Sequence, residues 1–188
     1  MGMALVLASS SPRRQELLRS AGFAFEVEAA DLPEIQLGGE APPAFAQRMA
    51  REKARAVFAR RPQDAVLGAD TIVVVEGEVL GKPRDPADAA RMLRTLSARS
   101  HEVTTAVCLL GPGIEETAAE TTLVTMSAIS EEEIQSYVAS GEPLDKAGAY
   151  AVQGGASRWV RRIEGCYFNV VGLPVPRVYE MLRKYRVA

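Results

Sequence analysis

Short apolar stretches alternate with helical patterns along this 188-residue chain, and two long strand patterns occupy its middle. Strands are predicted at residues 3–8, 23–28, 65–75, 78–80, 101–110 and 117–129. Helices are predicted to begin at Pro12, Ala44, Pro86, Glu131 and Val175. This alternation favours an α/β fold in which helices flank a mixed β-sheet.

Several single residues fix the ends of these elements. Ser11 is a good N-cap, and Pro12 suits the first position of the helix that follows. Gly22 is a typical stop for that helix. Ser130 and Glu133 have the spacing of a capping box, which predicts the start of another helix.

Composition excludes several classes of protein. The net charge of -2 gives no global positive field, so we expect neither nucleic acid nor membrane as a partner. No apolar run approaches the roughly 18 residues of a membrane span. The apolar stretch at residues 3–8 has no cationic segment before it, and it is shorter than the ~7–15 residues of a signal peptide core. We expect a single domain over residues 1–188.

The two cysteines, Cys108 and Cys166, are far apart in the chain and have no CxxC spacing. Neither a disulfide framework nor a zinc site fits this pattern. We expect two buried, reduced thiols, which suit a cytoplasmic protein.

Residues 9–14, with the sequence SSSPRR, combine the end of a strand, a turn rich in hydroxyls and the start of a helix with two arginines. Free backbone N–H groups at a helix start attract anions, and arginine binds phosphate through two parallel hydrogen bonds. An ordinary N-cap followed by solvated arginines stays open as an alternative. The chain has neither GxxxxGK[ST] nor GxGxxG, so this is neither a Walker loop nor a Rossmann turn.

Asp70 is a carboxylate within an apolar strand pattern, where a charge is costly unless something binds it. A metal ion or an incoming water is a natural partner, and an aspartate that caps a bend is the alternative. Lys82, held before a proline, has the reach to bind a phosphate, although such a lysine is often simply exposed.

Other polar residues have ordinary interpretations when they are taken singly. Lys53 lies in a predicted helix, where a solvated face explains it, and Glu34 lies in a proline-rich loop. His101 is the single histidine, and a structural role at a strand edge argues against histidine-based catalysis. Gln153 lies in a segment rich in glycine, and its amide has both a donor and an acceptor for the edge of a base.

Seven segments in this order and at these spacings resemble the Maf family of nucleotide pyrophosphatases across nearly the whole chain. The segments are SSSPRR, AREKA, LGADT, GKPRD, HEVTTAV, EPLDKAGAYAVQG and IEGCYFNVVGLP. The resemblance implies a curved mixed sheet flanked by helices, with two lobes and a central cleft for the nucleotide, similar to the inosine-triphosphate pyrophosphatases. It also implies a cytoplasmic homodimer that uses a divalent metal cation, Mg²⁺ or Mn²⁺.

The resemblance also assigns roles to individual residues. Asp70 matches the catalytic general base and, with Glu34, the metal ligands. The phosphate-binding positions of the family correspond to Ser9, Arg14, Lys53 and Lys82. The positions that separate substrate classes hold Arg13, Thr71 and Gln153, and all three match the class that prefers dTTP and UTP. Ser10 departs from many relatives, which carry glycine or another small residue there.

The expected activity is the hydrolysis of a nucleoside triphosphate, dTTP or UTP, to the monophosphate and pyrophosphate. One alternative is housecleaning of modified pyrimidine triphosphates. A non-enzymatic alternative is a nucleotide-responsive regulator of cell division, because the family is named for an effect on septum formation. A pure binding protein has no need of a base such as Asp70 beside phosphate-binding cations.

Overall fold

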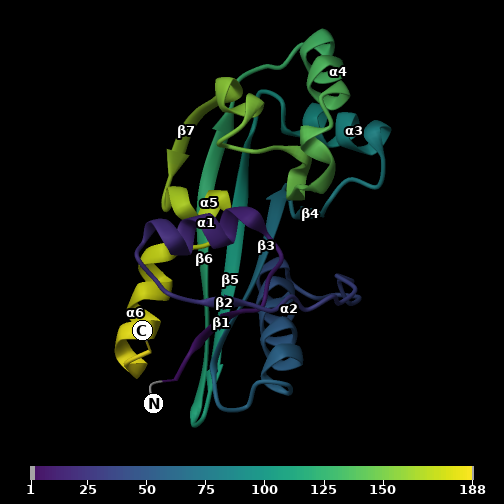
Figure 1. Ribbon diagram of the computed structural model, residues 1–188. Coiled ribbons are helices and arrows are strands. Elements are labelled where there is room, and N and C mark those ends of the chain that lie inside the picture. The colour runs from purple at the N-terminus through teal and green to yellow at the C-terminus, as the bar shows by residue number, and fades with distance from the viewer. Residues whose placement is uncertain (1–2, 188) are drawn as a thin grey trace. The chain divides into compact units, whose positions relative to one another are not determined.

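A computed structural model describes residues 3–187, and Figure 1 shows its helices and strands. Within these residues, seven strands form one mixed sheet in the order β2-β1-β3-β5-β6-β7, with β4 paired to β3. The strands are β1 (Leu5–Leu7), β2 (Glu26–Val27), β3 (Ala65–Val75), β4 (Glu78–Leu80), β5 (Ser100–Gly111), β6 (Ile114–Met126) and β7 (Val160–Glu164). The predicted α/β class with a mixed sheet is confirmed.

The helices flank this sheet. The α-helices are α1 (Pro12–Ser20), α2 (Pro42–Phe58), α3 (Pro86–Leu96), α4 (Glu131–Ala139), α5 (Tyr167–Val171) and α6 (Val175–Tyr185). The described residues also form three 3₁₀ turns, η1 (Glu142–Asp145), η2 (Ala147–Ala149) and η3 (Gly155–Trp159). Among the helices that the structure describes, none combines the length and apolarity that crossing a bilayer requires.

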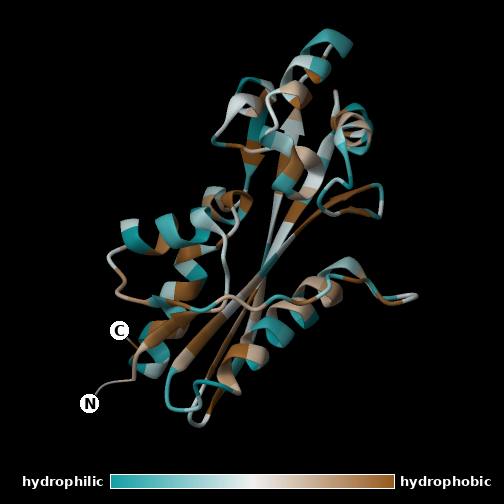
Figure 2. Cartoon of the chain, turned by 45° about the vertical axis from the view of Figure 1, so that its right-hand side comes forward, coloured by the Kyte–Doolittle hydropathy of each residue, from teal (hydrophilic) through white to brown (hydrophobic). Residues whose placement is uncertain are grey.

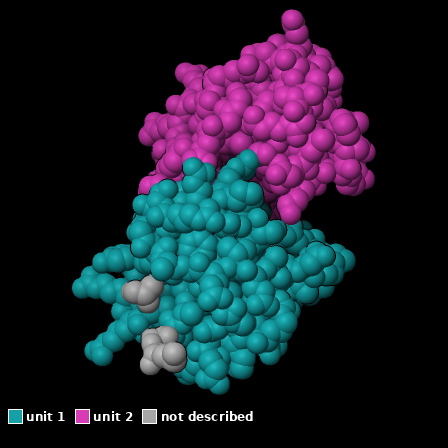
Figure 3. All heavy atoms as spheres, in the orientation of Figure 1, with its two compact units in different colours: residues 1–71, 105–120, 172–188 teal, residues 72–104, 121–171 magenta. Residues whose placement is uncertain are grey.

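Contacts between residues divide the chain into two compact units, which Figure 3 colours separately. Unit 1 consists of residues 1–71, 105–120 and 172–188, and unit 2 of residues 72–104 and 121–171. Strands β3, β5 and β6 contribute residues to both units. The single domain over residues 1–188 stays a prediction.

Strand β3 is the central element of the candidate site. It is parallel to β1, with Leu5 opposite Ala65, and antiparallel to β4, with Val75 opposite Glu78. The tight turn at residues 76–77 has positive φ at both positions, 51° and 84°. Two such residues form the type I′ turn that suits a two-residue hairpin, which confirms the predicted turn.

The apolar side chains are concentrated where the sheet and helices meet. Figure 2 shows hydrophobic colouring along the strands and mixed bands on the helices. Helix α2 buries Phe45, Met49 and Val57 completely or nearly so, at the spacing of an amphipathic helix. Its predicted start at Ala44 was two residues late, since Pro42 and Pro43 occupy the first turn. Proline is tolerated there because the first N–H groups have no partner within the helix.

The termini of other elements agree in part with the sequence prediction. The capping box of Ser130 and Glu133 is present at the start of α4. Strand β2 covers only Glu26–Val27 of the predicted residues 23–28, and both of its residues are exposed. Strand β7 and helix α5 occupy a region for which the sequence predicted no element. Cys108 and Cys166 are free thiols, but Cys166 is half-buried where burial was expected.

Gly68 sets how closely β3 packs on α2. A Cβ atom added there would lie 2.2 Å from the Ala50 carbonyl oxygen and 2.9 Å from the Ala54 Cβ. Both alanines are fully buried, and a backbone oxygen cannot move aside as a flexible side chain does. We therefore expect Gly68→Ala to lower the free energy of unfolding by about 3 kcal/mol, measured by urea denaturation.

Gly38→Ala is the matched control. A Cβ atom at Gly38 meets no described atom within 4 Å, and this glycine is exposed. The control should change the free energy of unfolding by no more than about 0.5 kcal/mol. Equal stability of the two variants would contradict the close packing of β3 against α2.

Candidate active site

A buried lysine joins two carboxylates from different parts of unit 1. Lys53 Nζ on α2 donates hydrogen bonds to Asp70 Oδ1 on β3 at 2.7 Å and to Glu34 Oε1 at 2.6 Å. Asp70 is 4% exposed and Lys53 is 7% exposed. The ordinary interpretation of Lys53, a residue on a solvated helix face, is wrong. The two negative charges account for its burial, because a buried cation must be paired.

The surroundings of Asp70 change its proton affinity. Burial raises the pKa of Asp70 above its ordinary value, and the positive charges of Lys53 and Arg14 oppose this shift without cancelling it. The negative charge of Glu34 acts in the same direction as burial. A carboxylate with a raised pKa is a better proton acceptor than an exposed aspartate, which suits a general base.

Arg14 lies at the centre of a second set of hydrogen bonds. From the first turns of α1, its Nε donates to the Gly172 carbonyl at 2.8 Å, Nη1 to Ser9 Oγ at 3.1 Å, and Nη2 to Thr71 Oγ1 at 2.9 Å. Ser11 caps α1 by accepting a hydrogen bond from the Arg14 backbone N–H at 3.5 Å. Residues 9–14 are therefore an ordered turn with a fixed guanidinium group.

The two sets of residues are neighbours, because the positive charge of Arg14 acts on the Asp70 carboxylate, and Asp70 is followed on β3 by Thr71, which Arg14 binds. Asp70 and Glu34 both oppose the lowering of the pKa of Arg14 that burial causes. Six of the predicted site residues therefore lie together in unit 1. They are Ser9, Arg14, Glu34, Lys53, Asp70 and Thr71.

The loop that carries Glu34 is bonded to α2 by Arg48. Arg48 Nε and Nη2 donate to the two carboxylate oxygens of Glu40 at 2.7 and 2.8 Å, and Nη2 also donates to the Ile35 carbonyl at 2.8 Å. The hydrogen bonds from Arg48 lower the pKa of Glu40 to about 2. The backbone next to Glu34 is therefore held against the helix that carries Lys53.

The other predicted residues have different surroundings. Arg13 is half-buried on α1 in unit 1. Lys82 and Gln153 are exposed and belong to unit 2, Lys82 before α3 and Gln153 before η3. Their approach to Asp70 stays a prediction.

Two residues of the Arg14 cluster had no predicted role. Thr105, which is fully buried, shares a hydrogen bond of 2.9 Å with Thr71. Gly172 supplies the carbonyl that binds Arg14, and its φ is 130°, a value that favours glycine. Both lie within the motifs HEVTTAV and IEGCYFNVVGLP. Their place in these motifs was the one indication in the sequence that they belong to the site. No local pattern indicates the hydrogen bond between Arg14 and Gly172, which are 158 positions apart.

His101 has the structural role expected of it. It is 2% exposed near the start of β5, and its Nε2 shares a hydrogen bond of 2.8 Å with Tyr150 Oη. Burial lowers the pKa of His101 to about 4, so the ring is neutral at pH 7. It belongs to unit 2, whereas Asp70 belongs to unit 1.

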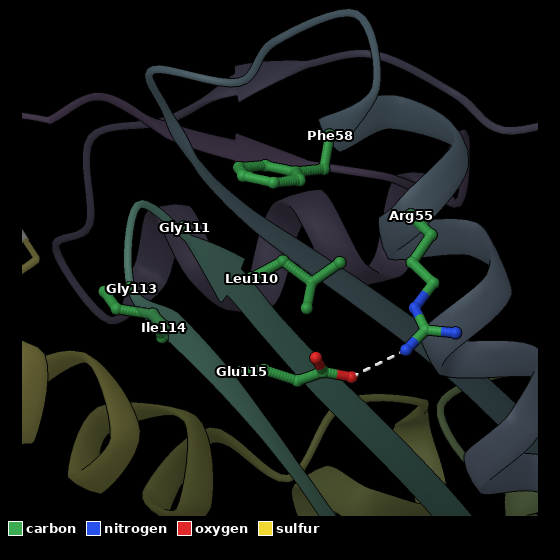
Figure 4. A pocket seen from close by; sticks show the side chains of 7 residues that line it. All are labelled: Arg55, Phe58, Leu110, Gly111, Gly113, Ile114 and Glu115. Carbon is green, nitrogen blue, oxygen red and sulfur yellow. Dashed lines mark hydrogen bonds and ion pairs between the residues drawn. The ribbon is translucent and has the colours of Figure 1, made fainter.

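Figure 4 shows a pocket of about 420 Å³ in unit 1. Phe58, Leu110 and Ile114 line it, and Arg55 forms an ion pair of 2.8 Å with Glu115 at its edge. None of its lining residues belongs to the predicted site. Arg55, the cation in its lining, is already paired with Glu115, so the pocket offers little to a polyphosphate.

The carboxylates fit the ligand preference of a magnesium or manganese ion. Within residues 3–187, no group of three or more His, Cys, Asp and Glu side chains has the geometry of a metal site. Mg²⁺ is commonly held by one or two carboxylates together with substrate phosphates, and it keeps several waters. Asp70 and Glu34, which both contact Lys53 Nζ, are two carboxylates of the kind that such an ion would require.

The family model and the sequence relatives match almost the whole chain. Residues 4–185 match the family described as Maf-like protein. A dTTP/UTP pyrophosphatase from Koribacter versatilis is 61% identical over 98% of this chain and 95% of its own. A second, from Symbiobacterium thermophilum, is 52% identical over 96% of this chain and 93% of its own. The Staphylococcus aureus Ham1 protein has a TM-score of 0.49 and 16% identity over 65% of this chain and 71% of its own.

The family match covers the segments that carry Ser9, Arg14, Lys53 and Asp70, the residues that the structure brings together in unit 1. Sequence motifs, local geometry and overall identity agree, and the chain belongs to the Maf family.

Proposed function

We propose that this protein hydrolyses dTTP and UTP to the nucleoside monophosphate and pyrophosphate. The observation that carries the proposal is the buried Asp70 carboxylate with its raised pKa, 2.7 Å from Lys53 Nζ and next to the Arg14 cluster. The names of two relatives at 52% and 61% identity, both dTTP/UTP pyrophosphatases, support the choice of substrates.

The phosphate groups would be bound by Ser9, Arg14, Lys53 and Lys82. A guanidinium and two ammonium groups would offset the negative charge of a triphosphate, and the guanidinium can bind phosphate oxygens through two parallel hydrogen bonds. Because the net charge of the chain is -2, this attraction must be local to the site.

Asp70 would act as the general base. Its carboxylate accepts a proton from a water molecule as the water oxygen forms a bond to the α-phosphorus. The bond between the α-phosphorus and the oxygen that bridges to the β-phosphate breaks, and pyrophosphate leaves with the electron pair. Positioning and electrostatic stabilisation by Arg14, Lys53 and Lys82 should dominate the rate, as in phosphoryl transfer generally.

Asp70 and Glu34 would hold the divalent cation, which when bound neutralises charge on the phosphate oxygens. The position of Glu34 is tied to α2 through the loop that Arg48 binds. Lys53 contacts both carboxylates and so keeps them near one another before the substrate arrives.

Arg13, Thr71 and Gln153 would select the base. The amide of Gln153 offers a donor and an acceptor to the polar edge of uracil or thymine. The Thr71 hydroxyl is held by Arg14 and Thr105, which links base selection to phosphate binding. A site that pairs buried polar groups rejects a base that leaves them unpaired.

A cytoplasmic homodimer without a nucleic acid or membrane partner completes the proposal. The free thiols of Cys108 and Cys166 are consistent with a reducing compartment. The homodimer is implied by the resemblance to the family.

A panel of UTP, dTTP, CTP, GTP and ATP, each with Mg²⁺ or Mn²⁺, tests the proposal. Both products should be followed, the monophosphate by chromatography and pyrophosphate by a coupled assay. We expect kcat/KM for UTP and dTTP to exceed the purine values by about 100-fold or more, because unpaired polar groups penalise the wrong base. Release of inorganic phosphate in place of pyrophosphate would contradict the proposed reaction.

The variant Gln153→Glu is the control for base selection. It keeps the length of the side chain but removes its amide donor, so activity on UTP should fall more than activity on GTP. Equal losses on both substrates would mean that Gln153 has a structural role only.

A further inference from the structure

The turn that carries Gln153 is held on both sides by two residues from α4 and η1. Before Gln153, the Ala151 backbone N–H donates to Tyr137 Oη at 3.2 Å. After it, the Gly155 backbone N–H donates to Glu142 Oε1 and Oε2 at 3.1 and 3.2 Å. Tyr137 Oη in turn donates to Glu142 Oε1 at 2.7 Å. All of these residues belong to unit 2.

Tyr137 is a rigid anchor for this network. Tyr137 is 4% exposed, and its ring meets the Trp159 ring edge to face, with centroids 5.2 Å apart. Trp159 is itself fixed, because its indole N–H donates to Glu133 Oε1 at 3.1 Å. The hydroxyl group of Tyr137 therefore has a defined position from which it accepts one hydrogen bond and donates another.

The carboxylate of Glu142 lies against the backbone next to Gln153. A Cβ atom added at Gly154 would lie 1.9 Å from Glu142 Oε1, so a glycine at this position lets the carboxylate approach. The Gly154 N–H donates to the Ala151 carbonyl at 3.1 Å and closes the turn. Within this closed turn Gln153 is exposed, whereas Ala151 is buried.

We propose that Tyr137 and Glu142 are positioning residues for base selection: they hold the turn of residues 151–155 so that the Gln153 amide faces the pyrimidine edge. This inference rests on the proposed role of Gln153. A hydrogen-bonding group discriminates only when it is held in place, and small displacements cost much of its effect. Tyr137 and Glu142 act without touching the base.

The first test is Tyr137→Phe, which removes the hydroxyl and keeps the ring against Trp159. We expect the ratio of kcat/KM for UTP to that for GTP to fall about 10-fold, mainly through KM for UTP, since a charge-assisted hydrogen bond is lost. Glu142→Gln keeps an acceptor for the Gly155 N–H. Its UTP-to-GTP ratio of kcat/KM should therefore lie between those of the wild type and Glu142→Ala.

Tyr150→Phe is the matched control. It also removes a buried tyrosine hydroxyl in unit 2, but that hydroxyl bonds to His101 and not to the turn. Its UTP-to-GTP ratio should stay within about twofold of the wild type. A similar loss of selectivity in both tyrosine variants would overturn the inference, because the effect would then reflect general loosening of unit 2.

Gln153→Ala separates this inference from the function on which it rests. If Gln153→Ala leaves the UTP-to-GTP ratio unchanged, the proposed role of Gln153 in base selection is contradicted. If Gln153→Ala abolishes selectivity and Tyr137→Phe leaves it intact, Gln153 selects the base, and the positioning role of Tyr137 and Glu142 is overturned. The double variant Tyr137→Phe/Gln153→Ala should be no less selective than Gln153→Ala alone, because both changes act through one amide.

Discussion

Replacing Asp70 with asparagine is expected to lower kcat for UTP about 100-fold or more, the usual contribution of an acid–base group. Asparagine keeps the shape of the side chain and can still accept a hydrogen bond from Lys53. It cannot take a proton from water. Steady-state assays of pyrophosphate release at saturating UTP measure the effect, and near-normal turnover would contradict the role of Asp70.

We expect Asp70→Asn to be at least as stable as the wild type. Because burial raises the pKa of Asp70 in the folded protein, folding favours the protonated carboxyl. That contribution to stability is present below the unfolded pKa and is lost as pH rises through the folded pKa. The neutral asparagine carries no charge to desolvate at any pH. Urea denaturation at pH 7 should therefore show a free energy of unfolding no lower than that of the wild type.

Asp64→Asn is the matched control for the charge change. Asp64 precedes β3 and forms an ion pair of 2.7 Å with Arg61, outside the candidate site. This variant should keep kcat within about twofold of the wild type, as expected for a surface change. A large loss in both variants would show that the net charge of unit 1, and not a base at Asp70, controls turnover.

The sequence predicted best those features that one or two neighbouring residues decide. Ser11 before Pro12 predicted the start of α1, and the spacing of Ser130 and Glu133 predicted the cap of α4. These groups act within one turn of chain, so the local sequence contains the whole interaction.

Features that depend on residues distant in the sequence could not be predicted from the local sequence alone. The helical pattern around Lys53 is that of a solvated face, and only its two distant carboxylates explain why it is buried. Resemblance to the family, and not local pattern, indicated Lys53 as a site residue. Thr105 and Gly172 were missed for the same reason, since each joins the Arg14 cluster through long-range hydrogen bonding.

The variant Lys53→Met should lower kcat/KM for UTP by about 100- to 1000-fold, as expected when a charged group that stabilises the transition state is removed. Methionine fills a similar volume in this buried position, but it leaves Asp70 and Glu34 without their shared cation. The loss is measured from initial rates of pyrophosphate release over a range of UTP concentrations. An unchanged kcat/KM for UTP would mean that Lys53 contributes only to packing.

The pH dependence of the same variant separates electrostatics from a loss of folding. The positive charge of Lys53 opposes the raised pKa of Asp70, so its removal should raise that pKa further. A base works only when it is ionised, and the acidic limb of the kcat/KM profile should therefore move to higher pH. In the double variant Lys53→Met/Glu34→Gln, the acidic limb should lie between that of the wild type and that of Lys53→Met. The reason is that the negative charge of Glu34 raises the pKa of Asp70, and the second change removes that charge. An unmoved limb in Lys53→Met would show that Lys53 does not set the protonation of Asp70, whatever the fall in rate.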